Sequence, residues 1–246
     1  NFFCASPVCS PARASLLTGK IPSGHGVLDW IRSGSVDADK FAAQGRENPY
    51  ADGYKNERKP IAYLEGQTTY TDILAEEGYH CALAGKWHLG DSVTPQHGFE
   101  KWYTIGLGGC CYYHPDIVDH GEITVEHGKY VTELFADKAL DYLDELAESE
   151  EPFYLAVNFT APHAPWGKEH HPAKWIDYYE NCDFASIPDI PDHPDLLTGP
   201  VYGTEKRKEN LRGYFAAVSA MDEQVGRILD ALEERHLTED SDLLRR

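Results

Sequence analysis

The fold is decided by Tyr79–Gly90, which has the sequence YHCALAGKWHLG. Its first six residues predict a short buried strand. The preceding segment, Thr68–Gly78, predicts a helix with a threonine cap and a glycine stop, with Ile73 and Leu74 facing inward. The last six residues, GKWHLG, then form a polar loop at the carboxyl end of the strand. This order is typical of an open α/β sheet, in which binding sites lie at the carboxyl ends of the strands.

The same pattern recurs further along the chain. Tyr130–Leu146 predicts an amphipathic helix, and Phe153–Phe159 predicts a second buried strand. Thr160–Trp166 follows directly, again at the end of a strand. Glu209–Leu232 carries an apolar stripe at helical spacing and predicts a long packing helix.

The remaining segments are expected to be irregular. Lys20–Gly45 is predicted to be a loop over the active face that carries Trp30 and Arg32. Asp91–Glu126 and His170–Gly203 are also predicted to be loops, because no sustained periodicity is visible in them.

Composition limits the partners. The 246 residues carry 22 Lys and Arg against 41 Asp and Glu, a formal net charge of -19. This charge disfavours nucleic acid and anionic membranes as partners, and no apolar run is long enough to cross a bilayer. An enzyme acting on anions would need to gather positive charge locally. The six cysteines include no C-x-x-C pair, which predicts reduced thiols and favours an intracellular or anaerobic setting.

A second stretch, with the sequence CSPARASLLTG, runs from Cys9 to Gly19. It predicts a short helix with Ser10 as its N-cap and Gly19 as its stop. Cys9 would then lie at the positive end of the helix, and Arg13 one turn on can reach back toward the same point. A nucleophile precursor beside two sources of positive charge suggests chemistry on sulfate or phosphate groups.

Two other loops carry candidate groups. Lys86 and His88 are two residues apart in the extended loop after the first strand, so both side chains can point to one side. A lysine is a good point-charge partner for a sulfate oxygen. His163 lies between two prolines after the second strand, where its position would be held rigidly.

These three motifs together resemble the type I, formylglycine-dependent sulfatases of the alkaline phosphatase superfamily. The resemblance rests on Cys9-x-Pro11-x-Arg13 with the following ASLLTG, on GKWHLG, and on the PHAPW run around His163. It implies an alkaline phosphatase-like three-layer α/β/α sandwich with a mostly parallel sheet. It also implies that residues 1–246 are the central part of the catalytic domain, without its first strand and its C-terminal strands and subdomain.

The resemblance also implies a mechanism. A formylglycine-generating enzyme oxidises Cys9 to formylglycine, whose hydrate binds a divalent cation, usually calcium, and attacks sulfur. His88 removes a proton to expel sulfate, Arg13 and Lys86 stabilise the charges, and His163 protonates the leaving alcohol or binds the sulfate. Residue 9 is the single metal ligand expected in this chain, with the other ligands outside it. We therefore expect the 246-residue chain alone to have little or no activity.

The substrate is expected to be a sulfated carbohydrate rather than a simple aryl sulfate. The aromatic residues that can stack on a sugar are Trp30, Trp166, Tyr112 and Tyr113, and the side chains that can bind its substituents are His25, His97, Lys168 and His170. Two other interpretations stay open. One is a phosphatase or phosphodiesterase of the same superfamily, and the other is a non-catalytic binding protein derived from a sulfatase.

Overall fold

The computed structural model describes residues 3–39, 57–188, 190–193 and 203–243. It divides into two compact units, one made of residues 1–160 with 227–246, and the other of residues 161–226. Parts of the predicted loops Lys20–Gly45 and His170–Gly203 lie outside the described residues.

The first unit contains a five-stranded sheet in the order β4-β3-β2-β1-β5. The strands are β1 (His80–Gly85), β2 (Phe99–Ile105), β3 (Asp116–Asp119), β4 (Glu122–Val125) and β5 (Phe153–Asn158). Central strand β1 pairs in parallel with both β2 and β5, whereas β3 and β4 extend the sheet in antiparallel fashion. The two strands predicted to begin at Tyr79 and at Phe153 are therefore confirmed as β1 and β5.

The prediction that Asp91–Glu126 is a loop is wrong, because β2, β3 and β4 lie within it. Strands β3 and β4 have only four residues each, which is too short to show a clear alternation. They are joined by His120 and Gly121, which both have positive φ, at 46° and 80°. Positive φ at both central residues is typical of the tight turns that join antiparallel strands.

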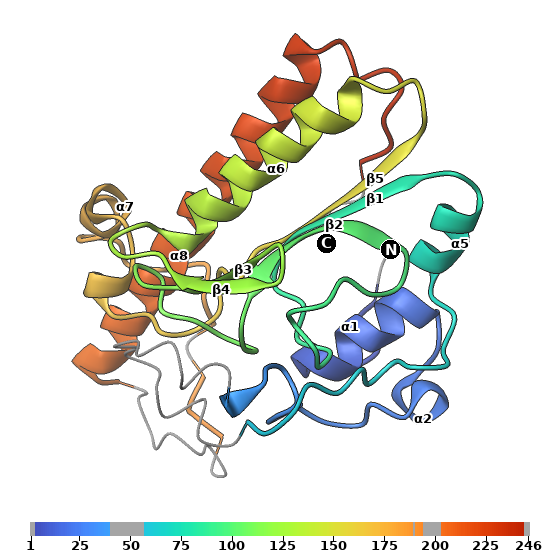
Figure 1. Ribbon diagram of the computed structural model, residues 1–246. Helices are drawn as coiled ribbons and strands as arrows, with labels where there is room; N and C mark the ends of the chain where they lie inside the picture. Colours follow the sequence, from blue (N-terminus) through green and yellow to red (C-terminus); the bar gives the residue numbers. More distant parts are fainter. Residues whose placement is uncertain (1–2, 40–56, 189, 194–202, 244–246) are drawn as a thin grey trace. The chain divides into compact units, whose positions relative to one another are not determined.

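Helices cover both faces of this sheet (Figure 1). One face carries α1 (Cys9–Thr18), α2 (Pro22–His25) and α5 (Tyr70–Glu76). The other face carries α6 (Val131–Ala147) and the last turns of α8 (Glu205–Glu234). The three-layer α/β/α arrangement is therefore confirmed, and α2 is a short helix inside a segment predicted to be a loop.

The core of this unit forms around β1, in which every residue after His80 is buried. On the face of the sheet covered by α6 and α8, Leu143 of α6 packs with Ala231 and Leu232 of α8. Burial of apolar surface on both faces of a strand is what a central parallel strand requires. It makes β1 a rigid support for the loop that follows it.

Helix α5 confirms its predicted cap but not its predicted inner face. Thr69 forms a capping box with Asp72. Ile73 is 51% exposed, so the prediction that it faces inward is wrong, whereas Leu74 packs against the core. Thr71 and Leu74 are three residues apart and share the inner face, which turns Ile73 away from it.

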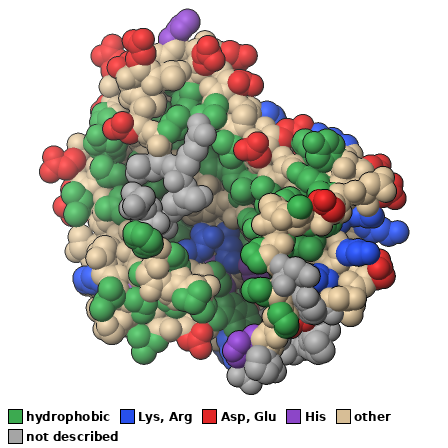
Figure 2. Space-filling model, turned by 180° about the vertical axis from the view of Figure 1, so that it is seen from behind, with side chains coloured by type: hydrophobic (Ala, Val, Ile, Leu, Met, Phe, Trp, Pro, Cys, Tyr) green, Lys and Arg blue, Asp and Glu red, His purple; other side chains and the backbone are tan. Residues whose placement is uncertain are grey.

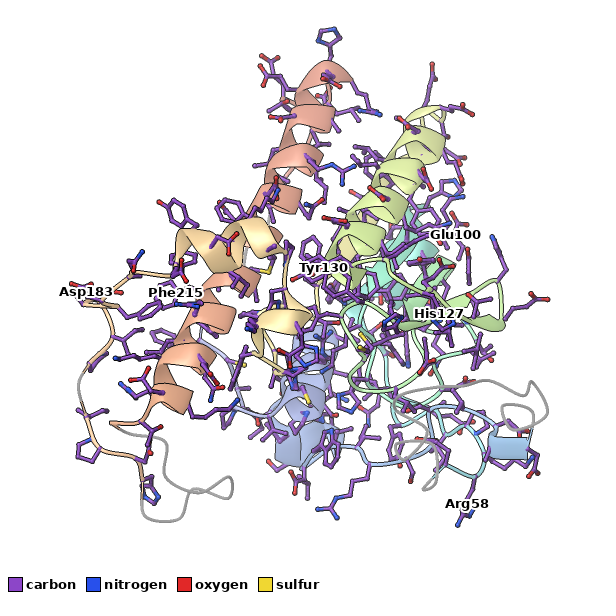
Figure 3. The ribbon with its side chains drawn as sticks, turned by 90° about the vertical axis from the view of Figure 1, so that its left-hand side faces the viewer. Arg58, Glu100, His127, Tyr130, Asp183 and Phe215 are labelled. Carbon is purple, nitrogen blue, oxygen red and sulfur yellow. The ribbon has the colours of Figure 1, made fainter. Side chains whose placement is uncertain are left out.

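The second unit contains a short 3₁₀-helix, η1 (Lys168–His170), helix α7 (Ala173–Tyr178) and the first part of α8. Phe215 of α8, labelled in Figure 3, packs against Tyr179 and Phe184. Helix α7 lies in a segment predicted to be irregular. It has only six residues, too few for a helical period to be visible in the sequence.

On the face shown in Figure 2, Asp and Glu side chains are scattered in small groups, mostly toward the periphery. This distribution agrees with a solvated acidic surface. In the described part of the chain, no helix is both long enough and apolar enough to cross a membrane.

Candidate active site

The site lies at the carboxyl ends of β1 and β5, where Gly85 pairs with Asn158. Gly85 has φ of +128°, and a Cβ atom there would lie 2.2 Å from the Asn158 carbonyl oxygen. Only glycine permits this approach, which lets the Lys86 amide donate to the same oxygen at 2.8 Å. The Lys86 carbonyl in turn accepts from Arg13 Nη1 at 2.7 Å and from Asn158 Nδ2 at 3.3 Å.

Helix α1 brings Cys9 to this edge. Its N-cap is Val8 in an extended conformation, and Cys9 is the first helical residue. The prediction that Ser10 is the N-cap is wrong: Ser10 is buried in the first turn, and its hydroxyl accepts from the Ile31 amide at 3.3 Å. Gly19 ends the helix in the left-handed conformation, as predicted. Cys9 therefore lies at the positive end of α1.

Cys9 and His88 are in direct contact. The Sγ atom of Cys9 lies 3.2 Å from Nδ1 of His88, and Nε2 of the same ring lies 3.0 Å from the Ile31 carbonyl oxygen. A carbonyl oxygen only accepts, so Nε2 carries the ring proton. In the neutral ring, the lone pair of Nδ1 then faces the side chain of residue 9. This is the geometry of a general base.

Lys86 supplies positive charge from a buried position. It is only 3% exposed, and burial, with a smaller contribution from Arg13, lowers its pKa to about 8. Within the described ranges, no carboxylate forms an ion pair with it. A buried ammonium next to the Arg13 guanidinium favours a bound anion, which would offset their repulsion.

The structure thus brings together Cys9, Arg13, Lys86 and His88. His163 belongs to the second unit, where its side chain is exposed and its Nδ1 lies 2.8 Å from the Ala164 carbonyl oxygen. Its participation in the site stays a prediction.

Sequence reasoning missed three residues that hold these groups: Ile31, Asn158 and Gly108. A Cβ at Gly108 would lie 2.0 Å from His88 Nε2, so the glycine is needed for the histidine ring to occupy its place. The cluster of glycines at residues 106–109 was the available signal. Ile31 acts through its backbone carbonyl, and such a contact leaves no mark in the sequence.

The four aromatic residues named as able to stack on a sugar lie in different environments. Trp30 is 51% exposed, and its ring edge faces His88 with centroids 6.4 Å apart. Tyr112 is fully buried and stacks on Tyr130, which Figure 3 labels at the start of α6, so the prediction for Tyr112 is wrong. Tyr113 is partly buried against Tyr130, and Trp166 lies in the second unit.

The histidines and lysine proposed for sugar substituents are placed as follows. His25 is buried between α1 and α2, where its Nε2 lies 2.9 Å from Ser15 Oγ and its Nδ1 accepts from the Val27 amide. Burial lowers its pKa, so it is a structural residue of the helix pair. His97 bonds to Asp72 of α5. Lys168 and His170 form the two ends of η1 in the second unit.

All six cysteines are free, and burial raises the pKa of the Cys110 thiol to about 12. Among residues 3–39, 57–188, 190–193 and 203–243, no group of three or more His, Cys, Asp or Glu side chains is arranged to hold a metal ion. A calcium ion normally takes six to eight oxygen ligands. The described residues therefore do not provide a cation site by themselves.

Comparisons with known proteins point to one family. The family model described as Sulfatase matches residues 1–243. The ulvan-active sulfatase of Formosa agariphila is 28% identical over 249 residues, which are 98% of this chain and 41% of that protein. The choline-sulfatase of Rhizobium meliloti is 28% identical over 284 residues, 99% of this chain and 48% of the relative.

A mammalian relative and a solved structure are also similar. The N-acetylgalactosamine-6-sulfatase of Canis lupus familiaris is 26% identical over 269 residues, 98% of this chain and 41% of that protein. A crystal structure from Bacteroides fragilis, described as a candidate sulfatase, superimposes with a TM-score of 0.69 at 24% identity, covering 95% of this chain and 50% of that chain. The chain spans less than half the length of these three curated relatives.

Proposed function

Because the chain belongs to the sulfatase family, we propose that it hydrolyses sulfate esters at the site formed by Cys9, Arg13, Lys86 and His88. The observation that carries this proposal is the contact of Cys9 Sγ with His88 Nδ1, at 3.2 Å, at the start of a helix. The names of the relatives support it, since each is a sulfatase.

Residue 9 is proposed to work as formylglycine, made from Cys9 by a formylglycine-generating enzyme. Its hydrated aldehyde supplies one hydroxyl as the nucleophile and a second whose deprotonation releases sulfate. The surroundings suit such a group, because Cys9 is only partly buried and lies against a hydrogen-bond acceptor. Positive potential at the start of α1 favours negative charge developing at this position.

His88 is proposed as the general base for residue 9. Its Nδ1 accepts the proton, while its Nε2 keeps the proton that it donates to the Ile31 carbonyl. The contact with Ile31 thereby prevents the ring from turning its protonated nitrogen toward residue 9. Protonation at Nδ1 would leave an imidazolium whose charge the departing sulfate stabilises.

Lys86 and Arg13 are proposed to hold the sulfate oxygens. Arg13 donates a hydrogen bond to the Lys86 carbonyl oxygen, which holds both cationic residues together at the end of β1. With a pKa of about 8, Lys86 is mostly protonated at neutral pH, and a bound sulfate would raise that pKa further. His163 is proposed as the acid for the leaving alcohol or as a further sulfate ligand. The family implies a divalent cation, expected to be calcium, but no step here depends on one, because the described residues form no cation site.

A sulfated carbohydrate is proposed as the substrate. The names of two relatives support this, one ulvan-active and one an N-acetylgalactosamine-6-sulfatase, although a third is a choline-sulfatase. The exposed indole of Trp30 next to His88 agrees with a ring-shaped alcohol.

The proposal is tested by producing the chain with and without a formylglycine-generating enzyme. Mass spectrometry of the peptide with residue 9 should show the aldehyde only with that enzyme. Hydrolysis of 4-nitrocatechol sulfate at high protein concentration should be slow, should require the aldehyde and should be absent in Cys9→Ala. Hydrolysis that persists in Cys9→Ala would overturn the proposal. If the chain produced with that enzyme keeps an unmodified thiol and shows no hydrolysis, the result would indicate a binding protein instead.

A further inference from the structure

The loop after α2 places an exposed aromatic ring next to the candidate base. Trp30 is 51% exposed, and its ring centroid lies 6.4 Å from that of His88 at an interplanar angle of 73°. His88 in turn contacts Cys9. The free indole surface is therefore separated from residue 9 by a single side chain.

Arg32 lies over the same indole. Its Cζ atom is 5.7 Å from the Trp30 ring centroid, and the side chain is exposed. Three other cations lie over aromatic rings in the described part of the chain, and each also has a carboxylate partner. The pairs are Lys101 with Glu145, Lys138 with Asp119, and Lys174 with Glu223. Across the same described ranges, no carboxylate forms an ion pair with Arg32.

This difference is notable because the chain has 41 acidic residues against 22 basic ones. Acidic side chains are abundant enough to neutralise a solvent-exposed guanidinium. Each of the three lysines that lie over an aromatic ring has such a carboxylate partner. Arg32 keeps its N–H donors available in a planar fork that matches an oxyanion. The indole below holds the guanidinium in place through a cation–π contact.

The backbone between the two residues is held firmly. The Ile31 amide donates to Ser10 and its carbonyl accepts from His88. Just beyond Arg32, the buried Glu57 carboxylate accepts from the amides of Gly34 and Ser35 at 2.8 Å each. Binding to this loop therefore costs little conformational entropy in its main chain.

We infer that Trp30 and Arg32 form a subsite for a sugar sulfate that carries a second oxyanion. With the ester sulfate at residue 9, the apolar face of the sugar ring packs on the indole of Trp30. The second oxyanion, such as an N-sulfate, then accepts hydrogen bonds from the Arg32 guanidinium. The orientation of the ester rests on the proposed function, whereas the aromatic and cationic surface does not.

The test measures binding apart from turnover. Isothermal titration calorimetry on the full chain carrying Cys9→Ala compares D-glucosamine N,6-disulfate with N-acetyl-D-glucosamine 6-sulfate, which lacks the second oxyanion. Arg32→Gln should weaken binding of the disulfate by roughly tenfold and leave the monosulfate unchanged. Trp30→Ala should weaken binding of both sugars by roughly tenfold, and Arg32→Lys should retain part of the preference for the disulfate.

The matched controls are Lys174→Gln and Trp175→Ala, which alter a cation–aromatic pair already neutralised by Glu223. Both controls should bind the two sugars like the parent chain. Equal effects of Arg32→Gln on both sugars, no effect on either, or no binding of the disulfate to the parent would overturn the inference. Preference for the disulfate that depends on Arg32, combined with no detectable hydrolysis by a Cys9 chain shown by mass spectrometry to carry formylglycine at residue 9, would contradict the proposed function but not the subsite.

Discussion

The Nε2 atom of His88 lies 3.0 Å from the carbonyl oxygen of Ile31, so the ring proton is held on the side away from Cys9. The neutral imidazole consequently faces residue 9 with a lone pair. A main-chain oxygen from a loop 57 residues earlier in the chain thus sets the imidazole tautomer that the proposed chemistry needs.

Replacing Gly108 tests whether the ring must stay in this place. In Gly108→Ala the new methyl group would occupy the position of the imidazole, so His88 must move away from both Ile31 and Cys9. Hydrolysis should fall by roughly 100-fold or more, and ¹⁵N spectra of the histidine ring should lose the Nε2–H pattern of the parent. Gly109→Ala is the matched control, because nothing lies within 4 Å of its new methyl group. Equal activity of the two variants would contradict the steric role of Gly108.

Removing the charge of Lys86 should separate stability from anion binding. Its low pKa shows that the folded state penalises the buried ammonium, so Lys86→Met should raise the free energy of unfolding at pH 7 by on the order of 1–3 kcal/mol. The same variant should lose the stabilisation that added sulfate gives the parent.

Urea denaturation with and without sodium sulfate checks both effects of Lys86→Met. The exposed Lys168→Met is the control and should change stability by less than about 0.5 kcal/mol. A Lys86→Met protein that is less stable than the parent, yet still stabilised by sulfate, would show that Lys86 does not bind the anion.

His80 should make stability depend on pH. Hydrogen bonds to Glu151 and to Glu100 raise its pKa above 6.5 in the folded protein. The protonated form is therefore favoured by folding, and its stabilisation is present below pH 6.5 and lost as pH rises through the folded pKa. His80→Gln should consequently destabilise the protein more at pH 6 than at pH 9 in urea titrations. An equal effect of His80→Gln at both pH values would rule out the linkage.

Glu57 should matter for stability through the loop that carries Trp30 and Ile31. Its buried carboxylate oxygen accepts from three successive amides, at residues 34, 35 and 36. Glu57→Gln replaces these with weaker neutral bonds and should lower the free energy of unfolding by about 1.5–3 kcal/mol. The exposed Glu65→Gln should be nearly neutral in the same thermal and urea measurements. A loss no larger than that of Glu65→Gln would show that the loop does not depend on this carboxylate.

The sequence predicted the elements that carry strong patterns. Strand β1 and helix α8 have long apolar signals, and the loop with Lys86 and His88 follows from its place after β1. It did not predict β3 and β4, whose four-residue lengths hide any alternation. Local patterns report burial and propensity, and short strands depend instead on their neighbours.

The candidate site shows the same division. Cys9, Arg13, Lys86 and His88 were predicted from their motifs, and the fold places them together. Tyr112 was named as a residue that can stack on a sugar and is buried, because aromatic character alone does not distinguish a core residue from an exposed one. The contact of Ile31 with His88 uses a carbonyl that every residue possesses, so no residue type could have indicated it.

The hydrogen bond between His88 and the Ile31 carbonyl has a practical consequence for protein engineering. Because Ile31 acts through its main chain, the side chains at positions 28, 30 and 32 can be varied while the imidazole keeps its orientation. Leu28, Trp30 and Arg32 are exposed and do not pack in the core. A combinatorial library restricted to these three positions would search substrate preference while the main-chain contact of Ile31 with His88 stays in place.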